Sequence, residues 1–228
     1  MGEIVEFPSN GDTASGYLAV PASGSGPGVV VIQEWWGLVP HITDVCDRFA
    51  AEGFVALAPD LYHGETTTEP DEAGKLMMAM NLGRAVRDLG GAVDHLLGLD
   101  AVSSEPLGVT GFCMGGGLTL VAACARPDAF GAVVPWYGLI PWAEAEPDWT
   151  ALAAPVIGHY ASEDEYFGPG PAGELEARLR DLGKDVEFFV YEGAHHAFFN
   201  DTRPEVHDAE ASALAWRRTV DFLHEHLG

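Results

Sequence analysis

Short apolar runs alternate with segments of helical periodicity along most of this chain. A short apolar run rich in Val, Ile, Leu and Phe predicts a strand that is buried on both faces of a sheet. We predict such strands at residues 28–33, 54–58, 107–112, 132–136, 155–160 and 186–191. Strands that alternate with helices assemble into a mostly parallel sheet with helices on both faces. The pattern therefore predicts an α/β fold with three layers.

The last helix gives the clearest helical pattern. Its apolar residues recur at spacings of three and four, which places on one stripe Ala213, Trp216, Val220, Leu223 and Leu227. Residues 16–21 fit an antiparallel strand at the edge of the sheet. Residues 71–98 fit either one long helix or two short helices, because glycines interrupt the helical pattern there.

Length and composition favour a single compact unit. The chain has 228 residues, of which 47% are hydrophobic, so it can bury one sizeable core, and we expect one domain over residues 1–228. No apolar run reaches the ~18 residues that a membrane helix needs, and the N-terminus shows no basic region followed by an apolar stretch. We therefore expect no membrane anchor, no secretion signal and a cytoplasmic location, with the chain a monomer or a homodimer.

Charge and cysteine content narrow the choice of partners. A formal net charge of −24 repels nucleic acid and anionic lipid at long range, so we expect neither as a partner. The acidic surface is consistent with adaptation to high salt. It is equally consistent with a genome whose base composition favours codons for acidic residues. The three cysteines form no CxxC pair, and their odd number argues against a disulfide framework. Cys46 and Cys124 have apolar neighbours in predicted helices and are expected to be buried.

Residues 111–115 carry the strongest chemical signal. They read Gly-Phe-Cys-Met-Gly and follow the apolar run 107–110. This is the nucleophile-elbow pattern, which places a nucleophile on a sharp turn between a strand and a helix, with Cys113 in the position that serine often occupies. Small residues two before and two after the nucleophile let the chain bend without a clash of Cβ atoms. A nucleophile also needs a base, and an acid that orients the base.

An acid and a histidine follow Cys113 in the order that α/β-hydrolases use. Asp164 comes shortly after strand 155–160, and His196 follows strand 186–191. The loops at the carboxyl ends of parallel strands converge at one edge of the sheet, so these side chains are expected to meet there. The sequence therefore predicts a catalytic triad of Cys113, His196 and Asp164.

The residues alone leave alternatives at two positions. Glu163 and Glu165 remain candidates for the acid, because loop register cannot be read from sequence, and His195 remains a candidate for the base. The other histidines show no metal-ligand spacing and are expected at the surface: His41, His63, His207, His224 and His226. We expect neither a metal ion nor an organic cofactor.

Four blocks of the chain resemble the dienelactone hydrolase family of α/β-hydrolases, and the resemblance covers nearly the whole chain. The blocks are residues 31–37, 58–62, 111–116 and 191–198. The resemblance implies a cysteine nucleophile and an acid after strand 155–160. It also implies that the catalytic histidine stands immediately before a small residue and a phenylalanine, which selects His196 over its neighbour.

The resemblance also gives a role to Glu34, which lies in the first block. In the family, this glutamate contacts the nucleophilic thiol in the resting state. A free thiol has a pKa near ~8.5 and is mostly protonated at neutral pH, whereas only the thiolate attacks well. A carboxylate beside the thiol can accept its proton. The alternative for Glu34 is an exposed carboxylate at the end of a strand.

Two further groups of candidates follow from position in the chain. The elbow predicts an oxyanion hole that consists of the backbone N–H groups of Met114 and Trp35. Aromatic residues near the ends of the predicted strands are candidates for the walls of a substrate pocket, and we expect these walls to include Trp36, Trp136, Tyr137 and Phe198.

The chain departs from the family where a carboxylate on the substrate would bind. Family members that act on the ring lactone hold its carboxylate with arginines, one early in the helix that matches residues 71–80 and one just after the catalytic histidine. Residues 70–74 and 199–201 contain no arginine, and Arg203 is the nearest basic side chain. We therefore expect the substrate to be an uncharged lactone or activated ester, cleaved through an acyl-cysteine intermediate.

Two other functions remain open. One is a general carboxylesterase that acts on an uncharged acyl substrate. The other belongs to a different class: a non-catalytic ligand or redox sensor that uses Cys113 as an oxidisable thiol. The complete set of acid and base argues for catalysis.

Overall fold

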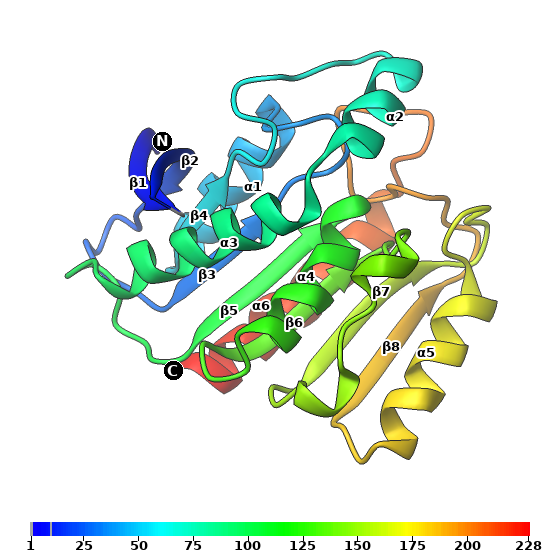
Figure 1. The fold of residues 1–228 in the computed structure, drawn as a ribbon. Helices are drawn as coiled ribbons and strands as arrows, with labels where there is room; N and C mark the ends of the chain where they lie inside the picture. The colour runs from blue at the N-terminus through cyan, green and yellow to red at the C-terminus, as the bar shows by residue number, and fades with distance from the viewer. Residues whose placement is uncertain (1, 10) are drawn as a thin grey trace.

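The structure, a computed structural model, describes residues 2–9 and 11–228 and is built around one mixed sheet (Figure 1). In this part of the chain the strand order is β1-β2-β4-β3-β5-β6-β7-β8. The strands β3 to β8 are parallel to one another, and β2 pairs antiparallel with both β1 and β4. The strands are β1 (Glu3–Ser9), β2 (Asp12–Ala19), β3 (Gly28–Ile32), β4 (Val55–Pro59), β5 (Leu107–Phe112), β6 (Phe130–Trp136), β7 (Val156–Ala161) and β8 (Val186–Tyr191).

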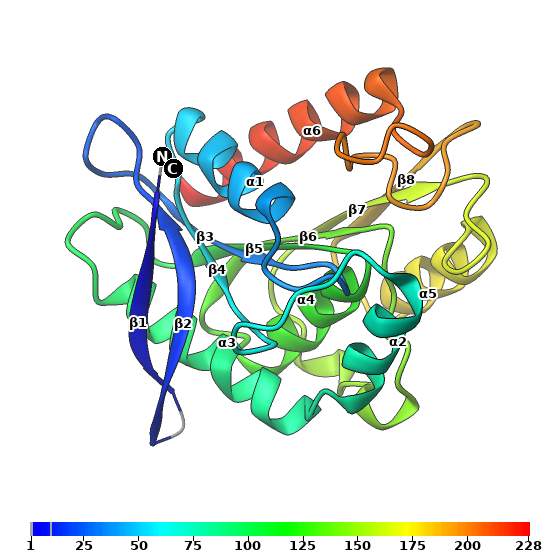
Figure 2. The same ribbon diagram turned by 90° about the horizontal axis from the view of Figure 1, so that it is seen from above.

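Helices cover both faces of the sheet. They are α1 (Pro40–Ala51), α2 (Pro70–Ala79), α3 (Leu82–Leu97), α4 (Met114–Ala125), α5 (Pro169–Asp181) and α6 (Ala209–Leu227), with short 3₁₀ helices at Ala143–Ala145 and Trp149–Ala151. Figure 2 shows α1 and α6 on one face and α3, α4 and α5 on the other. Figure 1 shows α2 beyond the upper end of the sheet. The three-layer α/β architecture predicted from the sequence is confirmed.

The strands predicted from the apolar runs are confirmed as β3 to β8, with ends that differ by at most two residues. The strand predicted at residues 16–21 is β2, which is antiparallel as expected but is not at the edge, because β1 lies outside it. The sequence of β1 gives little signal, since only Phe7 and Ser9 are buried in it. Pro8 fits this position, because sheets confine proline to edge strands.

The segment 71–98 forms two helices, α2 and α3, so the alternative with two helices is confirmed. They separate at Asn81, whose backbone is extended. The Asn81 side chain accepts a hydrogen bond from the N–H of Arg84 at 2.9 Å. A cap of this kind satisfies an amide that would otherwise be free at the start of a helix.

The stripe predicted for the last helix is wrong at Ala213, which is exposed. The small residues that α6 buries are instead Ala211 and Ala215. The pattern misplaced the stripe because it was centred on Trp216. The ring of Trp216 is half-buried and packs against Phe49 of α1, with 4.5 Å between the ring centroids, rather than against the sheet.

The core has two parts, one on each side of the sheet. Along β3, Val30 and Ile32 belong to the cluster that α3 and α4 complete, while Val29 and Val31 belong to the cluster that α1 and α6 complete. This alternation follows from the pleat of a strand, which sends successive side chains to opposite faces. Packing on both faces fixes the positions of the central strands, and with them the loops at their carboxyl ends.

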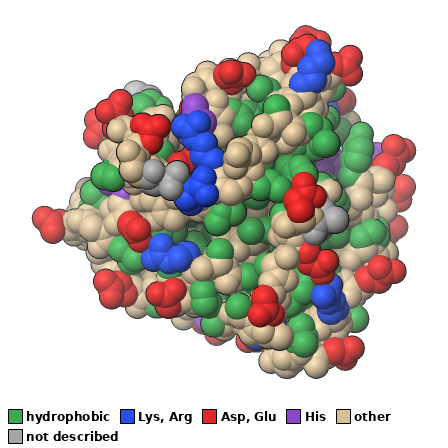
Figure 3. All heavy atoms as spheres, viewed as in Figure 1, with side chains coloured by type: hydrophobic (Ala, Val, Ile, Leu, Met, Phe, Trp, Pro, Cys, Tyr) green, Lys and Arg blue, Asp and Glu red, His purple; other side chains and the backbone are tan. Residues whose placement is uncertain are grey.

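No helix among the described residues is long and apolar enough to cross a membrane. Figure 3 shows acidic side chains scattered around the margin of one face of the molecule rather than gathered in one patch.

Candidate active site

The nucleophile elbow forms at the junction of β5 and α4. Cys113 has φ 55° and ψ −118°, a backbone conformation that L-residues rarely adopt. A Cβ at Gly111 would collide with the carbonyl oxygen of Gly115, and a Cβ at Gly115 would collide with the carbonyl oxygens of Ile32 and Gln33. The two glycines of the motif therefore allow the tight turn that presents the Cys113 thiol, which is partly exposed.

The structure brings His196 and Asp164 together. His196 Nδ1 lies 2.7 Å from Asp164 Oδ2, and this Asp164 side chain is buried. The other oxygen of Asp164 accepts hydrogen bonds from the backbone N–H groups of Tyr166 at 2.7 Å and Phe167 at 2.9 Å. The two neighbouring acids, Glu163 and Glu165, are exposed. Asp164 is thus the carboxylate of this loop that orients His196.

The surroundings of His196 favour its charged form. Burial lowers the pKa of His196, but the hydrogen bond to Asp164 and the nearby Cys113 and Asp164 side chains have the larger, opposite effect and raise it to about 10. Burial raises the pKa of Asp164, yet the hydrogen bond from His196, its charge and the two N–H groups outweigh burial and lower this pKa below its usual value. An imidazolium between a carboxylate and a thiol is the arrangement that favours a thiolate.

The other two cysteines lie in the core as expected. Cys46 and Cys124 are buried free thiols. Burial raises the pKa of Cys46, and it raises the pKa of Cys124 to about 11. Both therefore remain protonated at neutral pH, and neither is a competing nucleophile.

Glu34 lies in the loop after β3 and is almost completely buried, with 1% of its surface exposed. The hydroxyl of Tyr137 donates to its Oε1 at 3.4 Å, and the amide of Asn200 donates to its Oε2 at 2.9 Å. The alternative of a solvent-exposed carboxylate is wrong, because these partners hold Glu34 in the wall of the cavity that contains Cys113.

The N–H groups expected to form an oxyanion hole are free to donate hydrogen bonds to a ligand. Met114 is the first residue of α4, and Trp35 lies in the loop after β3. Among the described residues, the N–H groups of Met114 and Trp35 donate no hydrogen bond to another protein group. The first amides of a helix have no partner within the helix, and the helix dipole favours a negative ligand there.

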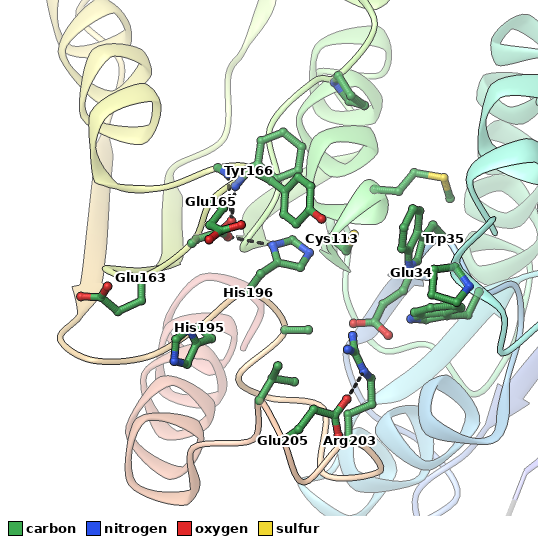
Figure 4. Close-up of a pocket in the computed structure, with 18 of the residues that line it drawn as sticks. Glu34, Trp35, Cys113, Glu163, Glu165, Tyr166, His195, His196, Arg203 and Glu205 are labelled. Carbon is green, nitrogen blue, oxygen red and sulfur yellow. Dashed lines mark hydrogen bonds and ion pairs between the residues drawn. The ribbon is translucent and has the colours of Figure 1, made fainter. Parts of the chain in front are cut away.

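A cavity of about 790 Å³ opens over these groups at the carboxyl ends of the strands. Its walls come from the loop after β3, the elbow, α2, the loops after β7 and β8, and the segment before α6. Figure 4 shows His196 beside Cys113 inside it. Trp36 lines the cavity as expected, and Pro70 and Met77 of α2 belong to the same lining.

The other three residues expected in the pocket walls belong to the core. Trp136, Tyr137 and Phe198 are fully buried and are not part of the cavity lining. Trp136 ends β6 and packs on Phe199, with 4.6 Å between ring centroids. Tyr137 has φ 35°, which turns its side chain inward beneath His196. For these residues the expectation of a direct substrate contact is corrected: they support the site from below.

Arg203 contributes to the cavity wall, although it lies beyond the positions where the family places its arginines. Its guanidinium carbon is 5.7 Å from the centre of the Trp36 ring, and its Nε donates to Glu205 at 2.9 Å. Figure 4 shows the guanidinium pointing toward Glu34.

The expectation that His41 lies at the surface is wrong. Its ring is buried between Phe112 and Phe199, and burial lowers its pKa. Oδ1 of Asp201 lies 3.7 Å from its Nδ1. Over residues 2–9 and 11–228, no three His, Cys, Asp or Glu side chains are grouped as in a metal site.

Three residues of the site were missed by sequence reasoning. Asn200 holds Glu34, and Tyr166 and Phe167 pack their rings against His196 with centroids 5.4 and 6.1 Å away. Their spacing from His196 or Asp164 matches no motif that we used. The one signal was their place in the loops that carry Asp164 and His196.

The chain is similar to known proteins over nearly its whole length. The model of the dienelactone hydrolase family matches residues 14–227. "Protein usf" of Aquifex pyrophilus is 40% identical over 233 residues, and "Putative carboxymethylenebutenolidase" of Aquifex aeolicus (strain VF5) is 34% identical over 233 residues; each alignment covers 100% of both chains.

Solved structures show the same fold. The crystal structure of a "Putative Dienelactone Hydrolase" from Klebsiella pneumoniae superposes with a TM-score of 0.88 at 29% identity, covering 99% of this chain and 98% of the other. Est1E from Butyrivibrio proteoclasticus superposes with a TM-score of 0.69 at 16% identity, which shows the fold alone. The chain therefore belongs to the dienelactone hydrolase family of the α/β-hydrolase superfamily and is a carboxylic ester hydrolase.

Proposed function

We propose that this enzyme hydrolyses a lactone or an activated ester through an acyl-cysteine intermediate formed on Cys113. One observation carries the proposal: His196 is hydrogen-bonded to Asp164 and lies beside Cys113, and all three residues line the same cavity (Figure 4). This is the nucleophile, base and orienting acid that covalent catalysis needs.

Acylation begins from the charged pair of the Cys113 thiolate and the His196 imidazolium. The sulfur attacks the carbonyl carbon, and the amides of Met114 and Trp35 stabilise the oxygen that becomes negative. Each such donor contributes roughly 3 kcal/mol where water is excluded. When the bond between carbon and the leaving oxygen breaks, His196 gives its proton to that oxygen. The alcohol departs, and a thioester remains on Cys113 with His196 neutral.

Deacylation uses the change in charge that acylation has caused. The thioester sulfur is neutral, so one of the two groups that raise the pKa of His196 no longer does so. Neutral His196 takes a proton from water as the water attacks the thioester. Collapse of this intermediate releases the carboxylic acid and restores the thiolate beside the imidazolium. Asp164 keeps the ring oriented through both steps.

Glu34 sets the protonation of the resting thiol in this mechanism. Its two oxygens are held by Tyr137 and Asn200, so the carboxylate stays in place as the thiol changes its state. A Glu34 carboxylate can accept the proton of the Cys113 thiol in place of His196. Where the proton goes to His196 instead, the negative charge of Glu34 disfavours the thiolate. Either effect changes the pH range over which Cys113 reacts.

We place uncharged lactones and esters first as substrates. The carboxylates in the cavity lining outnumber its one arginine, and they are Glu34, Glu163, Asp164, Glu165 and Glu205. Arg203 is already paired with Glu205. A carboxylate buried without a cationic partner costs several kcal/mol, which disfavours an anionic substrate.

Arg203 supports a second candidate, a lactone that bears a carboxylate. Its guanidinium stands in the cavity wall, and only its Nε is bonded to Glu205. The two candidates separate in one comparison of kcat/KM for a matched pair of esters that differ only in a carboxylate, measured at two salt concentrations. We expect the neutral ester to react faster. A preference for the carboxylated ester that disappears in Arg203→Ala would establish the second candidate.

The chemistry itself is tested by screening lactones and activated esters with the wild type and Cys113→Ala. Intact mass spectrometry should detect an acyl adduct on the wild type only. A protein that turns over none of these substrates, yet changes its structure with peroxide in a way that needs Cys113, would be a thiol sensor instead.

A further inference from the structure

Tyr166 is an exposed aromatic residue placed directly against the catalytic histidine. Its side chain is 71% exposed, yet it lines the cavity and its ring centroid lies 5.4 Å from that of His196 in an edge-to-face arrangement. Large apolar side chains that stay exposed at the mouth of a cavity mark surfaces that a ligand covers.

The loop that carries Tyr166 is fixed by Asp164. The carboxylate that orients His196 also accepts the N–H groups of Tyr166 and Phe167. A Cβ at Gly168 would lie 2.6 Å from the carbonyl oxygen of Asp164, so the chain turns back closely at that point. Tyr166 therefore keeps a defined position relative to the imidazole even though its ring is exposed.

The proposed chemistry indicates on which side of the cavity each part of the substrate lies. In acylation, the leaving oxygen must lie next to His196, which gives it a proton. The carbonyl oxygen points toward the amides of Met114 and Trp35, so the acyl chain extends away from His196. Figure 4 shows Tyr166 and Trp35 on opposite sides of Cys113. The alcohol part of the substrate thus lies on the side of Tyr166, and the acyl part on the side of the tryptophans.

We propose that Tyr166 is a specificity-determining residue whose ring forms the contact surface for the alcohol part of the ester, or for the oxygen side of a lactone ring, and that it selects flat, apolar leaving groups. This inference rests on the proposed acyl-cysteine mechanism and adds the preferred class of leaving group to it. Offset or edge-to-face contact of the leaving ring with Tyr166 would stabilise the complex as aromatic pairs do in protein cores.

The test compares two esters of the same acid, the phenyl ester and the hexafluoroisopropyl ester, whose leaving alcohols are of similar acidity. We expect Tyr166→Ala to lower the ratio of kcat/KM between the phenyl and hexafluoroisopropyl esters about tenfold, the effect of one aromatic contact. Tyr166→Phe should keep the ratio. Met78→Ala is the matched control, because Met78 is 72% exposed and lies outside the cavity lining; it should leave the ratio unchanged.

A second measurement separates substrate contact from mere shielding of His196. The alcohol has departed before deacylation, so Tyr166→Ala should slow the acylation burst more than the hydrolysis of the acyl-enzyme. An equal loss for both esters, or equal slowing of both steps, would overturn the proposal and make Tyr166 a cover for the imidazole. Absence of any acyl adduct on the wild type would instead contradict the proposed mechanism.

Discussion

Two histidines, the fully buried His159 and the partly buried His196, have pKa values shifted in opposite directions. His159 lies in β7 and His196 in the loop after β8, and burial lowers the pKa of both. The ring nitrogens of His159 meet only the hydroxyls of Tyr191 and Thr219, each at 2.9 Å. Burial and the nearby positive charge of Arg218 together lower its pKa to about 3.

Burial decides the state of His159, whereas charged partners outweigh burial at His196. The two groups at His196 carry or can carry negative charge, and they reverse the effect of burial and raise its pKa to about 10. Neutral partners at His159 satisfy hydrogen bonds without favouring the cation. The proposed mechanism uses His196 for proton transfer, whereas His159 packs in the core.

Removing the Cys113 thiol should have the largest effect on the contrast between the two histidines. Cys113→Ala should lower turnover by about 10⁴-fold or more, the loss typical of a missing nucleophile. Because one of the causes that raise it is lost, the pKa of His196 should also fall from about 10, while that of His159 stays low. NMR titration of the imidazole signals measures both.

Labelling of the wild type provides the control for this variant. Iodoacetamide should modify Cys113 faster than Cys46 or Cys124, since these two are buried and protonated, and it should abolish turnover. Equal labelling of all three cysteines with activity retained would remove Cys113 from the mechanism.

Removing His196 itself should have the next largest effect. His196→Ala should lower kcat/KM by about 10²- to 10⁴-fold, the usual contribution of general acid–base catalysis. The matched control is His195→Ala, whose side chain lies in the same loop but does not contact Asp164. A larger loss in His195→Ala than in His196→Ala would place the base one residue earlier.

Substitution of His159 should change the stability of the fold rather than the rate of turnover. Its pKa is lowered from 6.5 to about 3 in the folded protein, so the folded state resists protonation. The stability that neutral His159 provides is complete above pH 6.5 and is lost as the pH falls toward about 3. At about 1.4 kcal/mol per pH unit, this amounts to as much as about 3 kcal/mol between pH 6.5 and 4.

The measurement is the free energy of unfolding of the wild type and of His159→Asn as a function of pH. The variant should be less stable at pH 7 but should lose less stability on acidification. Parallel curves for the two proteins would show that His159 is protonated in the folded state and that the contrast with His196 is false.

The smallest effect is expected from Glu34→Gln. The glutamine keeps the shape of the side chain but removes a negative charge that Tyr137 and Asn200 hold in the cavity wall. The midpoint of the pH dependence of Cys113 alkylation should therefore move, with the fold intact by circular dichroism. An unchanged profile would mean that His196 alone controls the thiol.

The parts of the fold that the sequence predicted well are those with strong periodic signals. The strands β3 to β8 are rich in apolar residues, and their alternation with helices was enough to predict the layers. β1 was missed because it is a half-exposed edge strand with only two buried residues. The buried stripe of α6 was misplaced because Trp216 packs against another helix rather than against the sheet.

The site shows the same division between reactive groups and their supports. Cys113, Asp164 and His196 could be predicted because their residue types and order in the chain carry the chemistry. Trp136 and Tyr137 were misjudged, because an aromatic residue at a strand end faces the cavity or the core according to backbone angles that sequence does not show. Tyr166 contacts His196 because a turn in the loop after β7 brings the two rings together, and no residue pattern predicts that turn.

The double role of Asp164 has a consequence for redesign. One carboxylate holds both the histidine that the proposed mechanism uses and the loop that carries Tyr166, so we expect changes to that wall of the cavity to disturb catalysis. Another part of the lining comes from α2, which buries only Ala73 and contributes Met77 to the cavity. Libraries that vary α2 should therefore broaden the range of accepted acids at little catalytic loss, which makes this helix the natural place to graft new selectivity.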